Sequence, residues 1–230
     1  MRKTLAVLCL AATCLGAAPL AAAPPARPEA SFQVSGVEFR LPLPAGYCLP
    51  RGAQANLAAL VAKGDVQNVT HLTLFPCDAP ADPAGLSIQK DYILIKTPRQ
   101  VLDSTLSRDE LLQGLGQAFE NPAFTRALAS GELSKEAGKG VSSAVGTPVD
   151  LSGTVAPRGK DDFCAYLGGT VAVASSIKSY TLAVGTCITA VGGRVLSVYW
   201  YGSDERPAGV ARLLVKAKEL ARTIASRTGG

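Results

Sequence analysis

The residues of this chain that could do chemistry are few, and its cysteines are the most prominent of them. Four cysteines follow the N-terminal region: Cys48, Cys77, Cys164 and Cys187. Cys48 lies in the Pro- and Gly-rich stretch LPLPAGYCLP, the kind of exposed loop in which reactive residues are often found. Its thiol could act as a nucleophile, bind a metal ion or form half of a disulfide.

A nucleophile needs a base, and His71 is the one histidine of the sequence. A cysteine or serine beside His71 would make the chain a small secreted hydrolase, which is the alternative hypothesis for its function. Cys77 follows His71 in a stretch expected to be a strand, and the intervening residues would separate the two by roughly 20 Å. Cys48 is far from His71 in the sequence, so only the tertiary fold could bring the two side chains together.

Other reactive patterns are incomplete. A single histidine does not supply the usual zinc ligands, and the spacing of Cys48, His71 and Cys77 matches no common ligand pattern, so we expect no metal and no cofactor. The stretch 175–178 has the S-x-x-K spacing of penicillin-recognising enzymes, but the chain lacks their S-D-N and K-T-G elements.

Asp161 and Asp162 are the most obvious pair of carboxylates. Adjacent residues of a strand point to opposite faces, so the two make a weak acid–base pair. We therefore assign no catalytic residue.

The cysteines are better explained as disulfides. An even number of cysteines in an exported chain is typical of a disulfide framework, and four cysteines allow three pairings. Residues rich in Val, Ile, Leu, Tyr and Thr precede and follow Ser175-Ser176, which predicts a hairpin. If Ala174 and Ile177 close that hairpin, Cys164 lies directly opposite Cys187, within reach of a disulfide. This register predicts the bridges Cys164–Cys187 and Cys48–Cys77.

The N-terminal region has the pattern of a secretory signal peptide. Arg2 and Lys3 precede a run of apolar residues and then of small residues. We predict a signal peptide over 1–23, a Pro-rich leader over 24–30 and one folded domain over 31–230. An uncleaved N-terminal anchor is the alternative, although the apolar run is shorter than the roughly 20 residues of a membrane span.

Charge and hydropathy restrict the partners. The formal net charge of +5 falls to +3 when Arg2 and Lys3 are removed with the signal peptide. Such a small excess, scattered along the chain, argues against nucleic acid as the main partner. Beyond the signal no apolar run is long enough to cross a membrane, so we expect a mature protein that is periplasmic or secreted and does not span a membrane.

Periodicity and turn residues predict the elements that position these side chains. They are a hairpin over 32–41 turning at Ser35-Gly36, a helix over 53–64, strands over 68–77 and 91–96, a helix with a capping box at Ser107 and Glu110, a short helix from Pro122, antiparallel strands between Thr147 and Tyr201 with a turn at Gly192-Gly193, and a last helix capped by Ser203 or Asp204 with Pro207 in its first turn. The stretch 131–146 is rich in small residues, and we expect a surface loop there, with a flexible lid as the alternative.

Aromatic residues form the candidate binding surface. Tyr199-Trp200-Tyr201 ends a predicted strand, so these side chains point to both faces of a sheet. Tyr47 lies beside Cys48 in the Pro-rich loop. We expect Tyr47, Tyr199, Trp200 and Tyr201 to contribute to binding.

The order of elements is that of an α+β protein: an antiparallel sheet with helices packed against it, a long C-terminal helix and two disulfides. The stretches VEFRLPLPAGY and RVLSVYWYGSDERPAGVARLLVKAKELARTIAS resemble parts of the PsbP-like α/β/α sandwich superfamily. The resemblance is one of pattern, covers a small part of the chain and carries over no functional residue. It implies a binding, scaffolding or accessory protein of an exported or organellar compartment.

These observations predict a periplasmic, disulfide-stabilised domain that binds a protein or a small molecule of the cell envelope without catalysis. The secreted hydrolase described above is the alternative. A structural protein of the cell envelope is a third hypothesis.

Overall fold

The structure, a computed structural model, describes residues 28–79, 90–176 and 178–228. The predicted signal peptide and most of the predicted leader lie outside these residues, so they stay predictions. So do the limits of the predicted domain.

The fold is α+β, as the sequence predicts. Its elements are β1 (Glu29–Val34), β2 (Val37–Pro42), β3 (Tyr47–Cys48), α1 (Ala53–Gly64), β4 (Asn68–Pro76), β5 (Tyr92–Pro98), the 3-10 helix η1 (Arg99–Val101), α2 (Arg108–Glu120), α3 (Pro122–Ala129), α4 (Glu132–Val145), β6 (Val149–Lys160), β7 (Ala165–Ser175), β8 (Ser179–Val191), β9 (Arg194–Gly202) and α5 (Pro207–Arg227). A seven-stranded antiparallel sheet runs in the order β3-β4-β5-β9-β8-β7-β6, and β1 and β2 form a separate two-stranded sheet.

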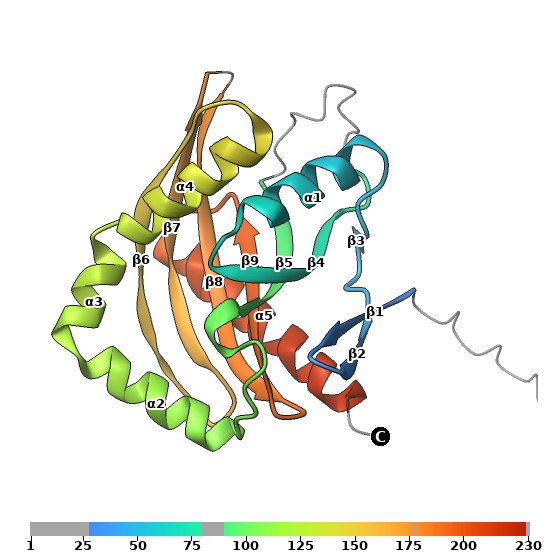
Figure 1. Ribbon diagram of the computed structural model, residues 1–230, viewed down its shortest axis with the longest axis vertical. Helices are drawn as coiled ribbons and strands as arrows, with labels where there is room; N and C mark the ends of the chain where they lie inside the picture. Colours follow the sequence, from blue (N-terminus) through green and yellow to red (C-terminus); the bar gives the residue numbers. More distant parts are fainter. Residues whose placement is uncertain (1–27, 80–89, 177, 229–230) are drawn as a thin grey trace, which may run out of the picture.

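The large sheet is covered on both faces (Figure 1). The C-terminal helix α5 packs against β7, β8 and β9 on one face, where it also contacts β2 of the small hairpin. Helices α1 to α4 lie over the other face, and α2 contacts β6, β7 and β8 there. The two layers give each face of the sheet a different chemical environment.

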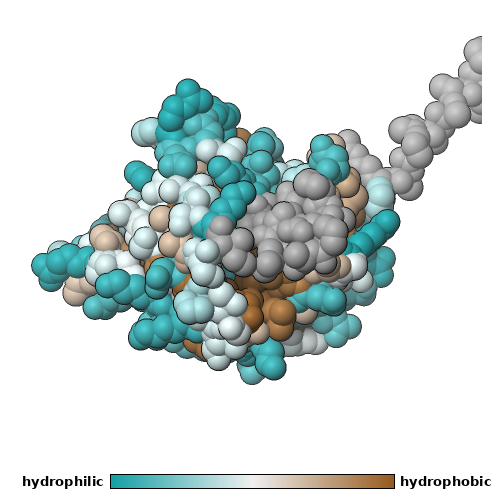
Figure 2. All heavy atoms as spheres, turned by 90° about the horizontal axis from the view of Figure 1, so that it is seen from above, coloured by the Kyte–Doolittle hydropathy of each residue, from teal (hydrophilic) through white to brown (hydrophobic). Residues whose placement is uncertain are grey.

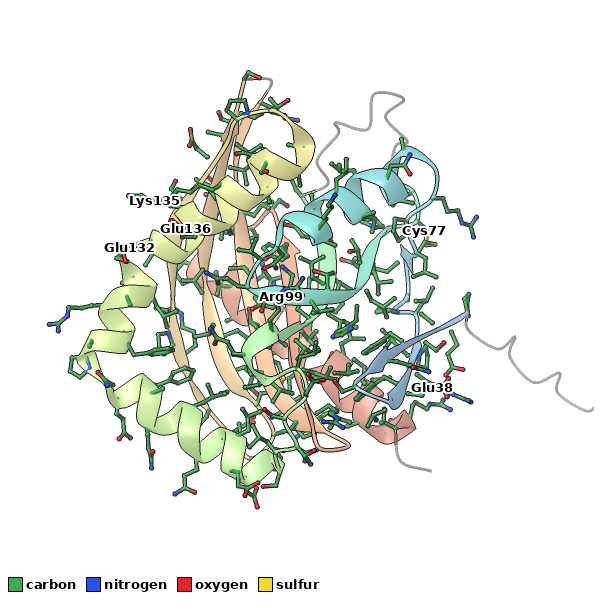
Figure 3. All side chains as sticks on the ribbon, in the orientation of Figure 1. Glu38, Cys77, Arg99, Glu132, Lys135 and Glu136 are labelled. Atoms are coloured by element: carbon green, nitrogen blue, oxygen red, sulfur yellow. A yellow bond between two sulfur atoms is a disulfide. The ribbon has the colours of Figure 1, made fainter. Side chains whose placement is uncertain are left out.

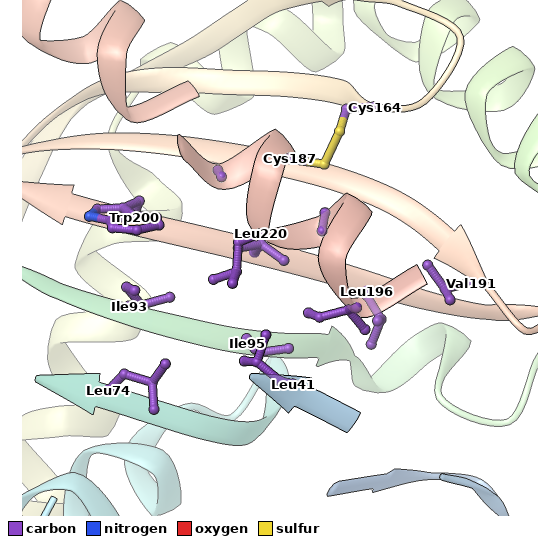
Figure 4. Close-up of a cluster of buried hydrophobic side chains, with 14 of the residues drawn as sticks. Leu41, Leu74, Ile93, Ile95, Cys164, Cys187, Val191, Leu196, Trp200 and Leu220 are labelled. Atoms are coloured by element: carbon purple, nitrogen blue, oxygen red, sulfur yellow. A yellow bond between two sulfur atoms is a disulfide. The ribbon is translucent and has the colours of Figure 1, made fainter. Parts of the chain in front are cut away.

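The main hydrophobic core lies between α5 and the sheet (Figure 4). Fully buried aliphatic side chains come from β2, β4, β5, β9 and α5, among them Leu41, Leu74, Ile95, Leu196 and Ile224. Burying such a side chain contributes about 1.5–3 kcal/mol, so this layer supplies much of the hydrophobic stabilisation.

Glycines in β8 and β7 let α5 approach the sheet closely. A Cβ atom at Gly185 would lie 2.5 Å from the backbone nitrogen of Leu214, and one at Gly168 would lie 2.9 Å from a methyl group of Val210. The helix therefore packs almost directly on the strand backbone.

Several predicted local features are confirmed. The hairpin turn at Ser35-Gly36 joins β1 to β2, and the turn at Gly192-Gly193 joins β8 to β9. The Ser107 side chain accepts the Glu110 amide while the Glu110 carboxylate accepts the Ser107 amide, which is the predicted capping box.

The prediction of a loop over 131–146 is wrong, because this stretch forms helix α4. Gly131 and Gly146, both in the left-handed conformation, flank it. Inside the helix, a Cβ at Gly138 would lie 3.0 Å from the Val149 carbonyl oxygen, and one at Gly140 would lie 2.0 Å from that of Gly64. The small residues allow close packing against β6 and α1, so they are neither the predicted surface loop nor the alternative lid.

The prediction of the cap of α5 is also wrong. Arg206 occupies the N-cap position, and no side chain caps the helix there. The Asp204 carboxylate instead accepts hydrogen bonds from the Arg206 backbone and side chain and from Arg212. These arginines keep the Asp204 carboxylate outside the N-cap position. Pro207 occupies the first turn of α5, as predicted.

Both predicted disulfides are present: Cys48–Cys77 and Cys164–Cys187. The register that led to them is wrong by two residues, because Cys187 lies opposite Tyr166 in the β7–β8 ladder. Cys164 precedes β7, and its amide donates to the Asp161 side chain in a tight turn. This turn brings the Cα atoms of Cys164 and Cys187 to 5.3 Å without direct strand pairing.

Within the described ranges, no helix has both the length and the apolar character needed to cross a membrane.

Candidate functional site

The structure divides the predicted aromatic surface between the two faces of the sheet. Trp200 is buried on the α5 side, where its indole Nε1 donates to the Tyr47 hydroxyl at 3.2 Å and the two rings meet edge to face at 5.2 Å. Tyr199 and Tyr201 point to the opposite side, since side chains alternate along β9. The structure thus joins Tyr47 to Trp200, and Tyr199 to Tyr201.

Four of the six tyrosines of the chain gather on the α1–α4 side of the sheet. We call Tyr92, Tyr180, Tyr199 and Tyr201 the tyrosine face. Tyr92 lies directly opposite Tyr201 in the β5–β9 ladder. The sequence analysis missed Tyr92 and Tyr180, and only the order of the strands brings them to the other two.

Three rings of the tyrosine face, those of Tyr92, Tyr199 and Tyr201, contact one another. Tyr92 and Tyr201 stack at 4.2 Å with an interplanar angle of 14°, and Tyr199 lies 6.3 Å from Tyr201. Phe75 on β4 extends the row, 6.2 Å from Tyr92. Each of these residues is partly exposed to solvent, and together their rings form an aromatic strip across three strands.

An ion pair lies at the edge of this strip. The Lys96 ammonium is 2.6 Å from an Asp65 carboxylate oxygen and 5.4 Å from the centre of the Tyr199 ring. Burial alone would raise the pKa of Asp65, but Lys96 and the hydrogen bonds from Asn68 outweigh burial and lower it. The two opposite charges of this pair therefore cancel at neutral pH.

The tyrosine hydroxyls are neutral as well. Burial raises the pKa of Tyr199 to about 12 and raises the pKa values of Tyr92, Tyr180 and Tyr201 well above the ordinary value. Each hydroxyl therefore keeps its proton and can both donate and accept a hydrogen bond.

Thr186 lies beneath this surface, directly opposite Tyr199 in the β8–β9 ladder. Its side chain is fully buried, and within the described residues its hydroxyl has no hydrogen-bond partner. An unpaired buried polar group costs about 1–3 kcal/mol. The sheet is thus not optimised for stability at this point.

A concavity of about 480 Å³ lies between α2 and the turn that joins β6 to β7. It is lined by Asp109, Leu112, Gln113, Gly116, Gln117, Glu120, Lys160, Asp161 and Asp162. Its wall is polar and apolar in similar parts, with carboxylates from both the helix and the turn.

Within this cleft Asp161 is fully engaged by the fold. One carboxylate oxygen accepts the amides of Phe163 and Cys164, each at 2.8 Å, and the other accepts the Tyr166 hydroxyl at 2.7 Å and the Lys218 ammonium. Burial opposes ionisation, but these four donors hold the pKa of Asp161 far below its ordinary value. Asp161 is a structural group that positions Cys164.

His71 is also part of the packing. Its Nε2 lies 2.9 Å from the Thr97 hydroxyl, which donates to the Val195 carbonyl, so His71 is the donor in this contact. The Phe32 ring stacks on the imidazole at 5.5 Å, and burial lowers the pKa of His71. The four cysteines in the described ranges are bonded in pairs, so none of these four is a thiol that His71 could activate.

Among the described residues, no group of three or more His, Cys, Asp and Glu side chains is placed to hold a metal ion.

Comparison with known proteins adds a fold-level likeness alone. No protein-family model matches the chain, and no curated protein matches it. Among solved structures it is similar to cyanobacterial PsbP (CyanoP) from Synechocystis sp. PCC 6803, at 15% identity and a TM-score of 0.33, over 92% of this chain and 99% of that chain. This likeness is weak, and we take no function or residue role from it.

Proposed function

We propose that this protein is an exported, periplasmic binding protein of the cell envelope, and that the tyrosine face is its binding site. The observation that carries the proposal is the aromatic strip formed by Tyr92, Tyr199 and Tyr201 with neutral hydroxyls. Tyrosine combines a large apolar ring with a polar tip, which makes it common at interfaces.

The chemistry of the face selects the kind of ligand. Lys96 and Asp65 neutralise each other beside the Tyr199 ring, so neither is a free counter-ion for a strongly charged ligand. The best fit is an uncharged segment of a protein or a small molecule with apolar surface and a few hydrogen-bonding groups.

The covalent frame supports the proposed location. Two disulfides are consistent with an extracytoplasmic compartment, because reducing cytosol keeps most cysteines as thiols. The N-terminal signal pattern supports export across a bacterial inner membrane. We propose that residues 31–230 act as one domain after removal of the signal.

We propose binding without catalysis. In the part of the chain that the structure describes, His71 pairs with Thr97 and the cysteines pair with each other. The hydrolase hypothesis requires a nucleophile held by His71. No specific observation favours that hypothesis.

Site-specific photo-crosslinking in cells tests the binding site. A photoreactive residue at Val66, which is 62% exposed and adjoins Asp65, should capture a partner. The matched control is Val215 on α5, which is 56% exposed on the other side of the sheet. We expect a reproducible adduct from position 66 alone, and its loss when Tyr201→Leu is combined with the probe in a folded variant.

Equal adducts from both positions, or an adduct that survives Tyr201→Leu, would refute the tyrosine face as the binding site. Cell fractionation with an intact mass of the exported chain tests the location. Recovery of the uncleaved chain in the cytoplasm would refute export.

A further inference from the structure

The two disulfides lie in opposite surroundings. Cys164 and Cys187 are both 0% exposed and lie within the core beneath α5 (Figure 4). Cys77 is exposed and Cys48 is partly exposed. Figure 3 shows Cys77 near the edge of the sheet, below helix α1. A reductant in solution can therefore reach Cys48–Cys77, whereas the core shields Cys164–Cys187 from it.

The exposed bridge also secures the most weakly held strand. The ladder between β3 and β4 contains two pairs, Tyr47 with Pro76 and Cys48 with Phe75. The Cys77 amide adds one hydrogen bond to the Gly46 carbonyl at 2.8 Å. With so few backbone contacts, the covalent bond contributes much of what keeps β3 on the sheet.

We propose that Cys48–Cys77 is a site of reversible thiol exchange with a dithiol reductant, whereas Cys164–Cys187 stays closed. This proposal goes beyond the binding function proposed above, since Tyr47 and Trp200 lie on the opposite side of the sheet from the tyrosine face. Access and the choice of the attacked sulfur control such exchange.

The reaction balances with the dithiol as the only co-reactant. A thiolate of the reductant attacks Sγ of Cys77, the Cys48–Cys77 bond breaks, and Cys48 leaves as a thiolate that takes up a proton. The second thiol of the reductant then attacks the mixed disulfide and releases Cys77. The dithiol loses two electrons and becomes a disulfide, and the two cysteines receive those electrons and two protons.

Opening the bridge has a consequence for the neighbouring aromatic pair. Tyr47 precedes Cys48 in β3 and accepts the hydrogen bond of Trp200. When β3 detaches, Tyr47 leaves the indole, and one edge of Trp200 becomes accessible beside the Lys216 ammonium, 5.2 Å from its ring. The exchange thus uncovers an aromatic and basic surface that is closed in the oxidised protein.

Native-state reduction followed by alkylation tests the exchange. The full mature protein is treated with graded dithiothreitol, quenched with an alkylating reagent and mapped by mass spectrometry. We expect Cys48 and Cys77 to be modified at least about tenfold faster than Cys164 and Cys187, because access limits the attack. Similar rates for both pairs, or faster modification of the core pair, would overturn the proposal.

Fluorescence tests the structural consequence, because Trp200 is the one tryptophan of the chain. We expect its emission to change with the same time course as opening of Cys48–Cys77 and to return on reoxidation. The double variant Cys48→Ser/Cys77→Ser should show, before any treatment, the emission of the wild-type protein with this bridge opened. Dithiothreitol should then cause no further change. Unchanged emission in wild-type protein after that bridge opens would refute the release of Tyr47, whether or not the double variant folds.

Discussion

The Asp65 carboxylate and the Lys96 ammonium, 2.6 Å apart, join the end of α1 to the middle of the large sheet. The same carboxylate accepts the backbone amides of Gln67 and Asn68. Asp65 therefore connects the turn after α1 to strand β5. Lys96 lies over Tyr199, and the pair therefore determines where α1 lies relative to the tyrosine face.

Lys96→Met should destabilise the protein more than removal of both charges does. Both side chains are nearly buried, and breaking one half of a buried pair costs about 3–5 kcal/mol. The double variant Asp65→Asn/Lys96→Met should recover a large part of that loss. Urea unfolding of the two single variants and the double variant measures the coupling, and additive effects would show that the pair does not act as a unit.

Asp161 should make stability depend on pH in the acid range. Its folded-state pKa is lower than its unfolded-state value, so the unfolded chain binds more protons. The stabilisation is complete above the unfolded pKa of about 3.9. It is lost as pH falls through the lower folded pKa. Asp161→Asn should remove this dependence and destabilise the protein near neutral pH by about 1–3 kcal/mol.

The matched control for that measurement is Asp162→Asn. The Asp162 side chain is 85% exposed and lies 4.0 Å from its arginine partner. Its replacement should leave the curve of unfolding free energy against pH nearly unchanged. Equal effects of the two substitutions would contradict the structural role of Asp161.

Two glycine substitutions should have opposite effects. Gly140→Ala places a methyl group 2.0 Å from the Gly64 carbonyl oxygen, so α1 and α4 must separate, at a cost of about 1–3 kcal/mol. Gly114→Ala in α2 meets nothing within 4 Å and should stabilise the protein by about 1 kcal/mol through helix propensity. Thermal unfolding measures both, and a stable Gly140→Ala variant would disprove the close contact of the two helices.

His71 should contribute a second, milder dependence on pH. Burial lowers its folded-state pKa, so the neutral imidazole is the form that the fold accepts. Stability should be highest above the unfolded pKa of about 6.5 and fall as pH drops through the folded pKa. His71→Gln keeps a hydrogen-bond donor for Thr97. It should remove the fall in stability between the unfolded and the folded pKa of His71. If the free energy of unfolding of His71→Gln varies with pH as steeply as that of the wild type, another group causes this dependence.

Local features of this fold could be predicted because short-range physics decides them. The capping box at Ser107 and Glu110 and the Gly192-Gly193 turn need a few neighbouring residues. The pairing of Cys164 with Cys187 was predicted correctly from a register that is wrong by two residues. The Asp161 turn, which the strand argument did not include, compensates for the difference.

Features that depend on packing were missed. The glycines of α4 look like signs of a loop in the sequence, and only the contacts of Gly138 with β6 and Gly140 with Gly64 show why a helix needs them. The position of hydrophobic residues on the surface likewise cannot be predicted from the composition of the chain. Figure 2 shows hydrophobic residues reaching the surface in one area of a mostly hydrophilic view.

The sequence by itself determined the α+β class and most of the elements, with α4 as the exception, because periodicity and turn residues are local properties. It predicted the correct cysteine partners, but the register and the Asp161 turn that bring Cys164 to Cys187 came only from the fold. Only the tertiary structure decided the candidate site. Tyr92 and Tyr201 are far apart in the chain and stack at 4.2 Å because β5 lies next to β9. The order of strands in a sheet results from non-local packing, and no short stretch of sequence encodes it.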